Sequence, residues 1–225
     1  IFPYTTLFRS ENVAHDLRSP LTRLRGRAEM ALMKNADSVR QREALQKAIE
    51  ETDGIVATLN AILSIAQIES GARREWTAVD LTAVCRDAAD LYEALAEEKD
   101  IHFTTEISEA VSIRGNRQLI SQAIGNLLDN AIKYTPEGGA VSLTLVKQDQ
   151  GVVVSVNDNG PGIPAELRER ALQRFVRLDV SRSQPGNGLG LSLVKAVAEQ
   201  HNAVLSLDDN RPGLRISLSF PPIAV

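Results

Sequence analysis

The chain has 225 residues, of which 43% are hydrophobic and 24% are charged, a composition typical of a globular protein with a buried core. Its formal net charge of −4 is too mild to indicate a nucleic-acid partner. The single cysteine, Cys85, excludes an intramolecular disulfide and a cysteine-based zinc site. No apolar run approaches the roughly 18 residues of a membrane span. These features predict one or two soluble domains from a reducing, cytoplasmic setting.

The first ten residues, IFPYTTLFRS, differ in character from the rest of the chain. They show no hydrophobic period and no helix cap. From Phe2 to Ser10 they match the translation of a common sequencing-adapter stretch at every position. We therefore predict that residues 1–10 are an artefact and that the natural sequence begins near Glu11.

Two segments with a heptad pattern follow, one from Glu11 to about Lys34 and one from Ser38 to Glu69. Both space their apolar residues by alternating steps of four and three, which is typical of a coiled-coil seam. The seam positions are Leu17, Leu21, Leu24, Ala28 and Ala31 in the first segment, and Leu45, Ile49, Thr52, Val56, Leu59, Leu63 and Ala66 in the second. Because only a short connection separates them, the two helices are predicted to form an antiparallel hairpin.

The apolar stripe of this hairpin is too wide for one copy to bury. Ile55 and Ile62 lie beside the seam, and we expect both to stay exposed in a single hairpin. Packing against a second hairpin would cover them in a four-helix bundle. A homodimer is the simplest source of that second hairpin.

His15 lies in the first helical segment, about 200° around the helix from the seam residue Leu17. A lone surface histidine usually has no role, but Asp16 follows directly and could fix the tautomer of its imidazole. Pro20 lies inside the same helix, where proline costs about 3 kcal/mol and bends the axis beside the histidine. This combination predicts a reactive histidine in a locally strained helix.

Beyond Trp76 the pattern changes to short alternating elements. The predicted helices span residues 80–96, 118–134 and 191–200, and the predicted strands span residues 101–107, 110–113, 140–147, 152–157, 203–207 and 214–220. This mixture predicts an α/β sandwich with helices on one face of a sheet. The chain as a whole is therefore expected to be α+β, with the helical hairpin over residues 11–72 and the sandwich over residues 73–225.

Three clusters of polar and glycine residues fall at the loops and helix ends of the predicted sandwich. In the first, Asn126, Asn130 and Lys133 recur at i, i+4 and i+7 and share one helix face. An amide oxygen can ligate Mg²⁺, which prefers oxygen ligands, and the lysine can hold a phosphate. A merely solvated face would rarely use two asparagines, because they are poor helix formers.

The second cluster, DNGPGIP over residues 158–164, follows a predicted strand. Its glycines allow a planar ligand to approach the backbone, and its carboxylate can accept from an adenine amino group, although a simple turn has a similar composition. The third cluster, GNGLGL over residues 186–191, leads into a helix whose first N–H groups can cradle an anion. The arginine-rich stretch from Ala165 to Pro185 is predicted to be a mobile lid over phosphates.

In this order, the clusters resemble the cytoplasmic core of a bacterial two-component sensor histidine kinase. The histidine box lies at 15–21, the asparagine box at 126–134, the glycine boxes at 158–162 and 186–190, and the phenylalanine box at 174–175. The resemblance extends from residue 11 to about residue 221. It implies a dimerisation and phosphotransfer hairpin followed by an ATP-binding domain of the Bergerat type, as in gyrases and related chaperones.

The resemblance also implies the roles of individual residues. His15 is the expected phosphoacceptor, Asp16 is its acid–base neighbour, and Ser19 occupies a position associated with dephosphorylation of the partner. The expected Mg²⁺ ligands are Asn130 and, in support, Asn126. The expected ATP-binding residues are Asn126, Asn130, Lys133, Tyr134, Asp158, Gly160, Gly162, Phe175, Arg177, Gly186, Gly188, Leu189, Gly190 and Leu191. Among them, Asp158 is expected to accept from the adenine amino group.

The implied activity is ATP-dependent autophosphorylation on His15, followed by phosphoryl transfer to an aspartate in the receiver domain of a response regulator. Relatives often carry Thr or Asn where this chain has Ser19, which leaves a phosphatase activity open. The parent protein is expected to be a homodimer anchored in the membrane, with this part in the cytoplasm.

Two alternatives remain open. One is a stand-alone ATPase of the mismatch-repair or gyrase type, which would not need the heptad hairpin with His15. The other is a degenerate kinase acting as a scaffold, which would not need intact nucleotide boxes. His102 and His201 are predicted to be structural, and Cys85 is predicted to lie in the core.

Overall fold

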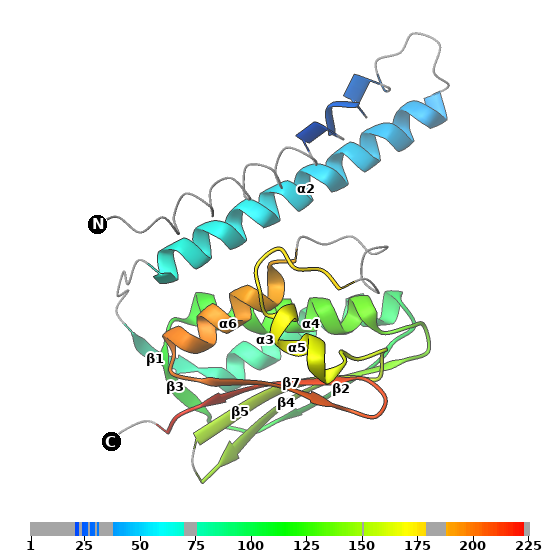
Figure 1. The fold of residues 1–225 in the computed structure, drawn as a ribbon. Helices are drawn as coiled ribbons and strands as arrows, with labels where there is room; N and C mark the ends of the chain where they lie inside the picture. Colours follow the sequence, from blue (N-terminus) through cyan, green and yellow to red (C-terminus); the bar gives the residue numbers. More distant parts are fainter. Residues whose placement is uncertain are drawn as a thin grey trace, which may run out of the picture. The chain divides into compact units, whose positions relative to one another are not determined.

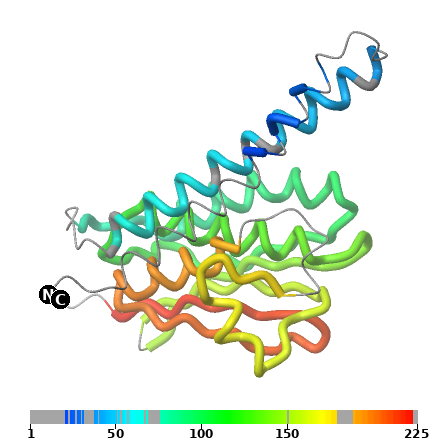
Figure 2. Tube along the Cα trace, turned by 45° about the horizontal axis from the view of Figure 1, so that its top comes forward, coloured from blue at the N-terminus to red at the C-terminus, as the bar shows by residue number. Residues whose placement is uncertain are grey.

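The computed structural model describes residues 21, 22, 24–26, 28, 29, 31, 38–69, 76–149, 151–178 and 188–222. The chain divides into two compact units, residues 1–62 and residues 63–225, and Figures 1 and 2 show the elements of each. Within the described ranges, no helix combines the length and the apolar character needed to cross a bilayer.

The long helix α2 runs from Ser38 to Glu69, as the heptad pattern predicted. Its seam faces outward in the single chain, with side chains between 46% and 56% exposed at Leu45, Ile49, Val56, Leu59 and Leu63. Other positions around α2 are better covered, since Ala48, Thr58 and Ile65 are buried. Of the first predicted helix, the described residues between Leu21 and Ala31 are helical.

The expectation that Ile55 and Ile62 stay exposed in one hairpin is wrong, because both are partly buried. Ile55 lies seven residues after Ala48 and Ile62 lies seven residues after Ile55, so all three share one face of α2. A helix turns one face toward its core, and in α2 that face is the one with Ala48, not the seam.

The second unit is built on a five-stranded sheet in the order β2-β4-β5-β7-β6 (Figure 1). Only the β2–β4 pair is parallel, and the other three pairs in this sheet are antiparallel. The strands are β2 (His102–Ile107), β4 (Ala140–Gln148), β5 (Gly151–Asp158), β6 (Val204–Asp209) and β7 (Leu214–Phe220). A separate antiparallel pair joins β1 (Thr77–Asp80), which was not among the predicted strands, to β3 (Ser112–Gly115).

Three helices cover one face of the sheet, which confirms the predicted α+β sandwich (Figure 1). They are α3 (Leu81–Glu98), α4 (Arg117–Tyr134) and α6 (Gly190–Gln200). The core lies between the layers, where the fully buried side chains include Ile120, Ile124, Leu127, Leu128, Leu143, Leu145, Leu193 and Leu218. Because α4 is buried along one side, its polar face and its carboxyl end are held in fixed positions.

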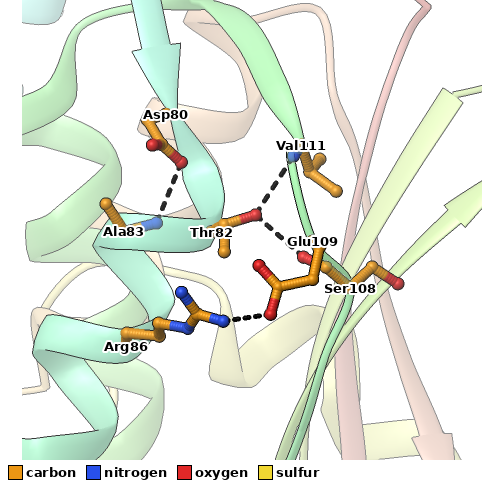
Figure 3. A network of polar contacts seen from close by, with 7 residues as sticks. All are labelled: Asp80, Thr82, Ala83, Arg86, Ser108, Glu109 and Val111. Carbon is orange, nitrogen blue, oxygen red and sulfur yellow. Dashed lines mark hydrogen bonds and ion pairs between the residues drawn. The ribbon is translucent and has the colours of Figure 1, made fainter.

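A polar network fastens the start of α3 to the loop between β2 and β3 (Figure 3). Asp80 caps the helix by accepting from the N–H of Ala83. The Thr82 hydroxyl donates to the carbonyl of Ser108 and accepts from the N–H of Val111, at 2.8 and 3.1 Å. Arg86 forms an ion pair with Glu109 in the same loop.

The interior of α3 contains the only cysteine of the chain. Cys85 is fully buried, as predicted, and burial raises the pKa of its thiol to about 12.

The predicted lid from Ala165 to Pro185 is not a loop throughout. Residues Ala165–Ala171 form the short helix α5, and residues 179–187 lie outside the described part of the chain. The sequence does carry signals for α5: Glu166 falls in its first turn, and Arg168 and Arg170 fall in its last. Charges in these positions complement the helix dipole.

Candidate functional site

The first predicted cluster lies on α4, where Asn126, Asn130 and Lys133 are all partly buried on one face. The Asn126 Nδ2 donates to the carbonyl of Gln122 at 3.0 Å. A Cβ atom placed on Gly190 would lie 3.4 Å from Asn126 Oδ1 and 3.5 Å from Asn130 Nδ2. The amino end of α6 therefore approaches both asparagines, and the structure brings the first and third clusters together.

The third cluster also meets the phenylalanine box. The N–H of Phe175 donates to the carbonyl of Gly188 at 2.9 Å. Gly188 has a φ of +65°, and a Cβ there would lie 2.8 Å from the carbonyl oxygen of Val176, so only glycine fits this position. Leu189 is buried and Leu191 is partly buried at the start of α6. Arg177 is partly buried, and Gly186 lies outside the described residues.

The second cluster begins at Asp158, the last residue of β5, which is only 9% exposed. Its Oδ1 accepts from the N–H groups of Gly160 and Leu214, at 2.9 and 3.3 Å. Burial raises the pKa of this carboxyl above its usual value, and the two N–H donors counter that rise in part. A Cβ on Gly160 would lie 2.8 Å from the carbonyl oxygen of Tyr134, which places the second cluster against the carboxyl end of α4.

A cavity of about 520 Å³ opens where these two clusters meet. It is lined by Lys99, Lys133, Tyr134, Thr135, Pro136, Glu137, Gly160 and Pro161. The Lys133 Nζ donates to the Tyr134 hydroxyl at 3.0 Å and lies 4.7 Å from the centre of its ring. The cavity is therefore walled by residues that the sequence assigned to two different clusters.

Several residues around this cavity were not among the predicted site residues. Lys99 comes from the end of α3 and donates to the carbonyl of Ile132 at 2.9 Å, and nothing in the sequence marks it. Thr135 is buried with no hydrogen-bond partner for its hydroxyl. Thr135 and Glu137 directly follow the asparagine box, so extending that box by three residues would have included both.

The asparagine pair fits a hard cation better than a transition metal. The described residues contain no cluster of three His, Cys, Asp or Glu side chains suited to a metal. Amide oxygens suit Mg²⁺, which takes one or two protein ligands and completes its shell with water and phosphate oxygens. His15, Asp16 and Ser19 lie outside the described residues, and their predicted roles remain predictions.

Two protein-family models match the chain. The His Kinase A (phospho-acceptor) domain matches residues 10–71. The family of histidine kinase-, DNA gyrase B- and HSP90-like ATPases matches residues 115–224. The predicted division at residues 72 and 73 falls between these two matches.

Individual relatives agree with these families. The chain is 30% identical to the sensor protein IrlS of Burkholderia pseudomallei over 217 residues, which cover 94% of this chain and 46% of IrlS. The structure of the mycobacterial sensor histidine kinase MprB is 33% identical, with a TM-score of 0.57, and the match covers 65% of this chain and 97% of that one. The chain spans about half the length of the curated relatives it matches.

A further solved structure contains a partner. It is the histidine kinase ThkA in complex with the response regulator protein TrrA, and it is 25% identical to this chain with a TM-score of 0.68. The match covers 95% of this chain and 60% of that one.

Proposed function

Because the chain belongs to the sensor histidine kinases of bacterial two-component systems, we propose that it transfers the γ-phosphoryl group of ATP to His15. The phosphoryl group then passes to an aspartate in the receiver domain of a response regulator. The observation that carries this proposal is the convergence of three clusters on α4, where Gly190 approaches both asparagines and Gly160 meets Tyr134.

The described residues divide the binding of ATP among them. Asp158, held at the end of β5, accepts from the adenine amino group. Lys133 and Tyr134 bind phosphate or ribose from the wall of the cavity. The glycines at the start of α6 leave its N–H groups open to phosphate oxygens. The match to the family of histidine kinase-, DNA gyrase B- and HSP90-like ATPases supports ATP as the ligand of these residues.

Asn130, with Asn126 beside it, is the proposed site for Mg²⁺. A bound Mg²⁺ would neutralise charge on the β- and γ-phosphates, which is the main form of catalysis in phosphoryl transfer. In the transfer itself, a ring nitrogen of His15 forms a bond to the γ-phosphorus as the bond to the β–γ bridging oxygen breaks and ADP leaves. Asp16 accepts the proton from the other ring nitrogen.

We also propose that the hairpin forms a homodimer. The outward-facing seam of α2 supports this, since five apolar side chains at heptad spacing are about half exposed in the single chain. A second copy of the same seam would bury them in a four-helix bundle.

The remaining partners follow from the family. The complex of ThkA with TrrA supports a response regulator as the acceptor, and the hydroxyl of Ser19 is suited to a phosphatase step on that partner. Since the chain matches about half the length of its curated relatives, we propose that it is the cytoplasmic part of a membrane-anchored sensor.

Incubation of the chain with γ-labelled ATP and Mg²⁺ tests the proposal. A histidine kinase retains label on the protein, and that label is lost in acid and kept in alkali. Release of free phosphate with no protein-bound label would indicate a stand-alone ATPase. Neither product, despite ATP binding, would indicate a scaffold.

A further inference from the structure

The turn between β6 and β7 packs directly on the start of the second cluster. The N–H of Asn210 donates to the carbonyl of Gly213 at 3.1 Å and closes this turn. The Asn210 side-chain amide donates to the main-chain carbonyl of Asp158 at 2.7 Å. A Cβ on Gly213, whose φ is +109°, would lie 1.8 Å from the same Asp158 oxygen. Only glycine therefore allows the turn to reach the backbone of Asp158.

The same turn also reaches the Asp158 side chain. Leu214 follows Gly213 directly, and its N–H is one of the two donors to Asp158 Oδ1. The other donor, Gly160, belongs to the second cluster itself. Since both donors bind Oδ1, the carboxyl group is fixed in orientation and Oδ2 accepts from neither of them.

A second anchor joins the far end of the cluster to the same hairpin. The Arg168 guanidinium on α5 donates to the carbonyls of Ile163 and Leu207, both at 3.1 Å, and pairs with Asp209. Figures 1 and 2 show α5 and the β6–β7 turn at the same end of the sheet. Residues on both sides of the glycines at 160 and 162 are thus tied to one hairpin.

We propose that the turn formed by residues 210–213 positions Asp158 for adenine, with Asn210 as the positioning residue and Oδ2 as the oxygen that meets the amino group. This inference rests on the proposed role of Asp158 in nucleotide binding. Asn210 touches no ligand and acts only through Asp158. Its loss should therefore affect the contact with the adenine amino group and leave the phosphate and ribose contacts unchanged.

The test measures the affinity of the full chain for two nucleotides by calorimetry. One is ATP, and the other is purine riboside triphosphate, which lacks the 6-amino group. We expect Asn210→Ala to weaken ATP binding about tenfold, the scale of one displaced hydrogen bond to a charged group, and to leave the other nucleotide unchanged. Asn210→Asp keeps the side-chain shape without the amide donor and is measured alongside, so that a folding defect in Asn210→Ala leaves the inference testable.

Two further variants serve as controls for this binding measurement. Asp208→Ala changes an exposed residue on the same hairpin and should bind both nucleotides as the wild type does. Asp158→Asn should lose the preference for ATP over purine riboside triphosphate.

If Asp158→Asn keeps that preference, the proposed role of Asp158 is wrong and the inference falls with it. If Asp158→Asn loses the preference while both Asn210 variants keep it, or weaken the two nucleotides equally, the positioning role is wrong and the proposed function stands.

Discussion

His201 shows how a single buried residue can join three elements of the ATP-binding unit. Its Nε2 accepts from the N–H of Asn116 at 3.0 Å, so the ring proton lies on Nδ1 and is donated to the carbonyl of Val197 at 2.8 Å. The ring stacks on Trp76, with the two centres 5.2 Å apart. This confirms the predicted structural role of His201, and it requires the neutral imidazole. Burial accordingly lowers the pKa of His201 below its usual 6.5.

This pKa shift predicts a loss of stability in mild acid. Below about pH 6.5 the unfolded chain binds a proton at His201 that the folded chain does not bind, so the free energy of unfolding decreases as the pH falls. We expect urea midpoints to drop between about pH 7.5 and about pH 5.5, by at most about 1.4 kcal/mol per pH unit from this residue.

Two variants separate His201 from the other titrating groups. His201→Asn should be less stable at neutral pH and should lose most of this pH dependence. Replacement of the exposed His102 by Asn should leave the pH dependence as in the wild type. An unchanged slope in His201→Asn would contradict the assignment.

The second prediction for a single residue concerns Asn130. Asn130→Ala removes the proposed Mg²⁺ ligand, and we expect protein-bound label from γ-labelled ATP to fall by about 100-fold, the upper range for disturbing a metal site. Ser121→Ala, on another side of α4, is the matched control and should be fully active. Circular dichroism should show both variants folded. Near-normal labelling of Asn130→Ala with unchanged Mg²⁺ dependence would reject the assignment.

The site residues that could be predicted are those that lie close to one another in the sequence. The pair Asn126 and Asn130 and the run after Asp158 carry their chemistry in local spacing. Asn210 and Lys99 could not be found in this way, because each reaches the site only through the packing of a distant element. Asn210 lies 52 residues from Asp158 along the chain, and such a contact leaves no local pattern.

Among the elements, the strongly periodic ones were predicted almost to the residue, whereas two short ones, β1 and α5, were not predicted. The long helix α2 has the predicted bounds, Ser38–Glu69, because its heptads repeat over many turns. The strand β1 has four residues and α5 has seven, too few to show a period. The buried face of α2 was also predicted wrongly. Ala48 and Ile62 belong to a second row of residues at heptad spacing, beside the seam. The sequence alone does not show which of the two rows is buried in a single chain.

The seam of α2 gives a prediction at the scale of this element. Leu59 is about half exposed in the single chain, so Leu59→Asp should leave the protomer folded. In a dimer the same charge would lie in an apolar seam, where an unpaired charge is strongly unfavourable.

We therefore expect sedimentation at tens of micromolar to show a dimer for the wild type and a folded monomer for Leu59→Asp. Asn60→Asp places the same charge on the exposed neighbouring residue and should remain a dimer. A folded wild-type monomer at this concentration would contradict the four-helix bundle.

At the scale of the whole molecule, the two family matches assign different halves of one reaction to different parts of the chain. The phospho-acceptor family covers residues 10–71 and the ATPase family covers residues 115–224. For the ATP side, the structure describes the clusters around α4 in detail, and we propose that they bind the nucleotide. The acceptor side rests on the order of the boxes, beginning with the histidine box at residues 15–21. The central claim is that these two parts meet in one chemical step at His15.

The most direct measurement of that claim compares the wild-type chain with His15→Gln, using γ-labelled ATP and a separate binding titration. The wild type should take up acid-labile phosphate, and His15→Gln should bind ATP with unchanged affinity and take up none. Acid-labile label on His15→Gln at the wild-type level would contradict the claim and place the phosphoacceptor elsewhere in the chain.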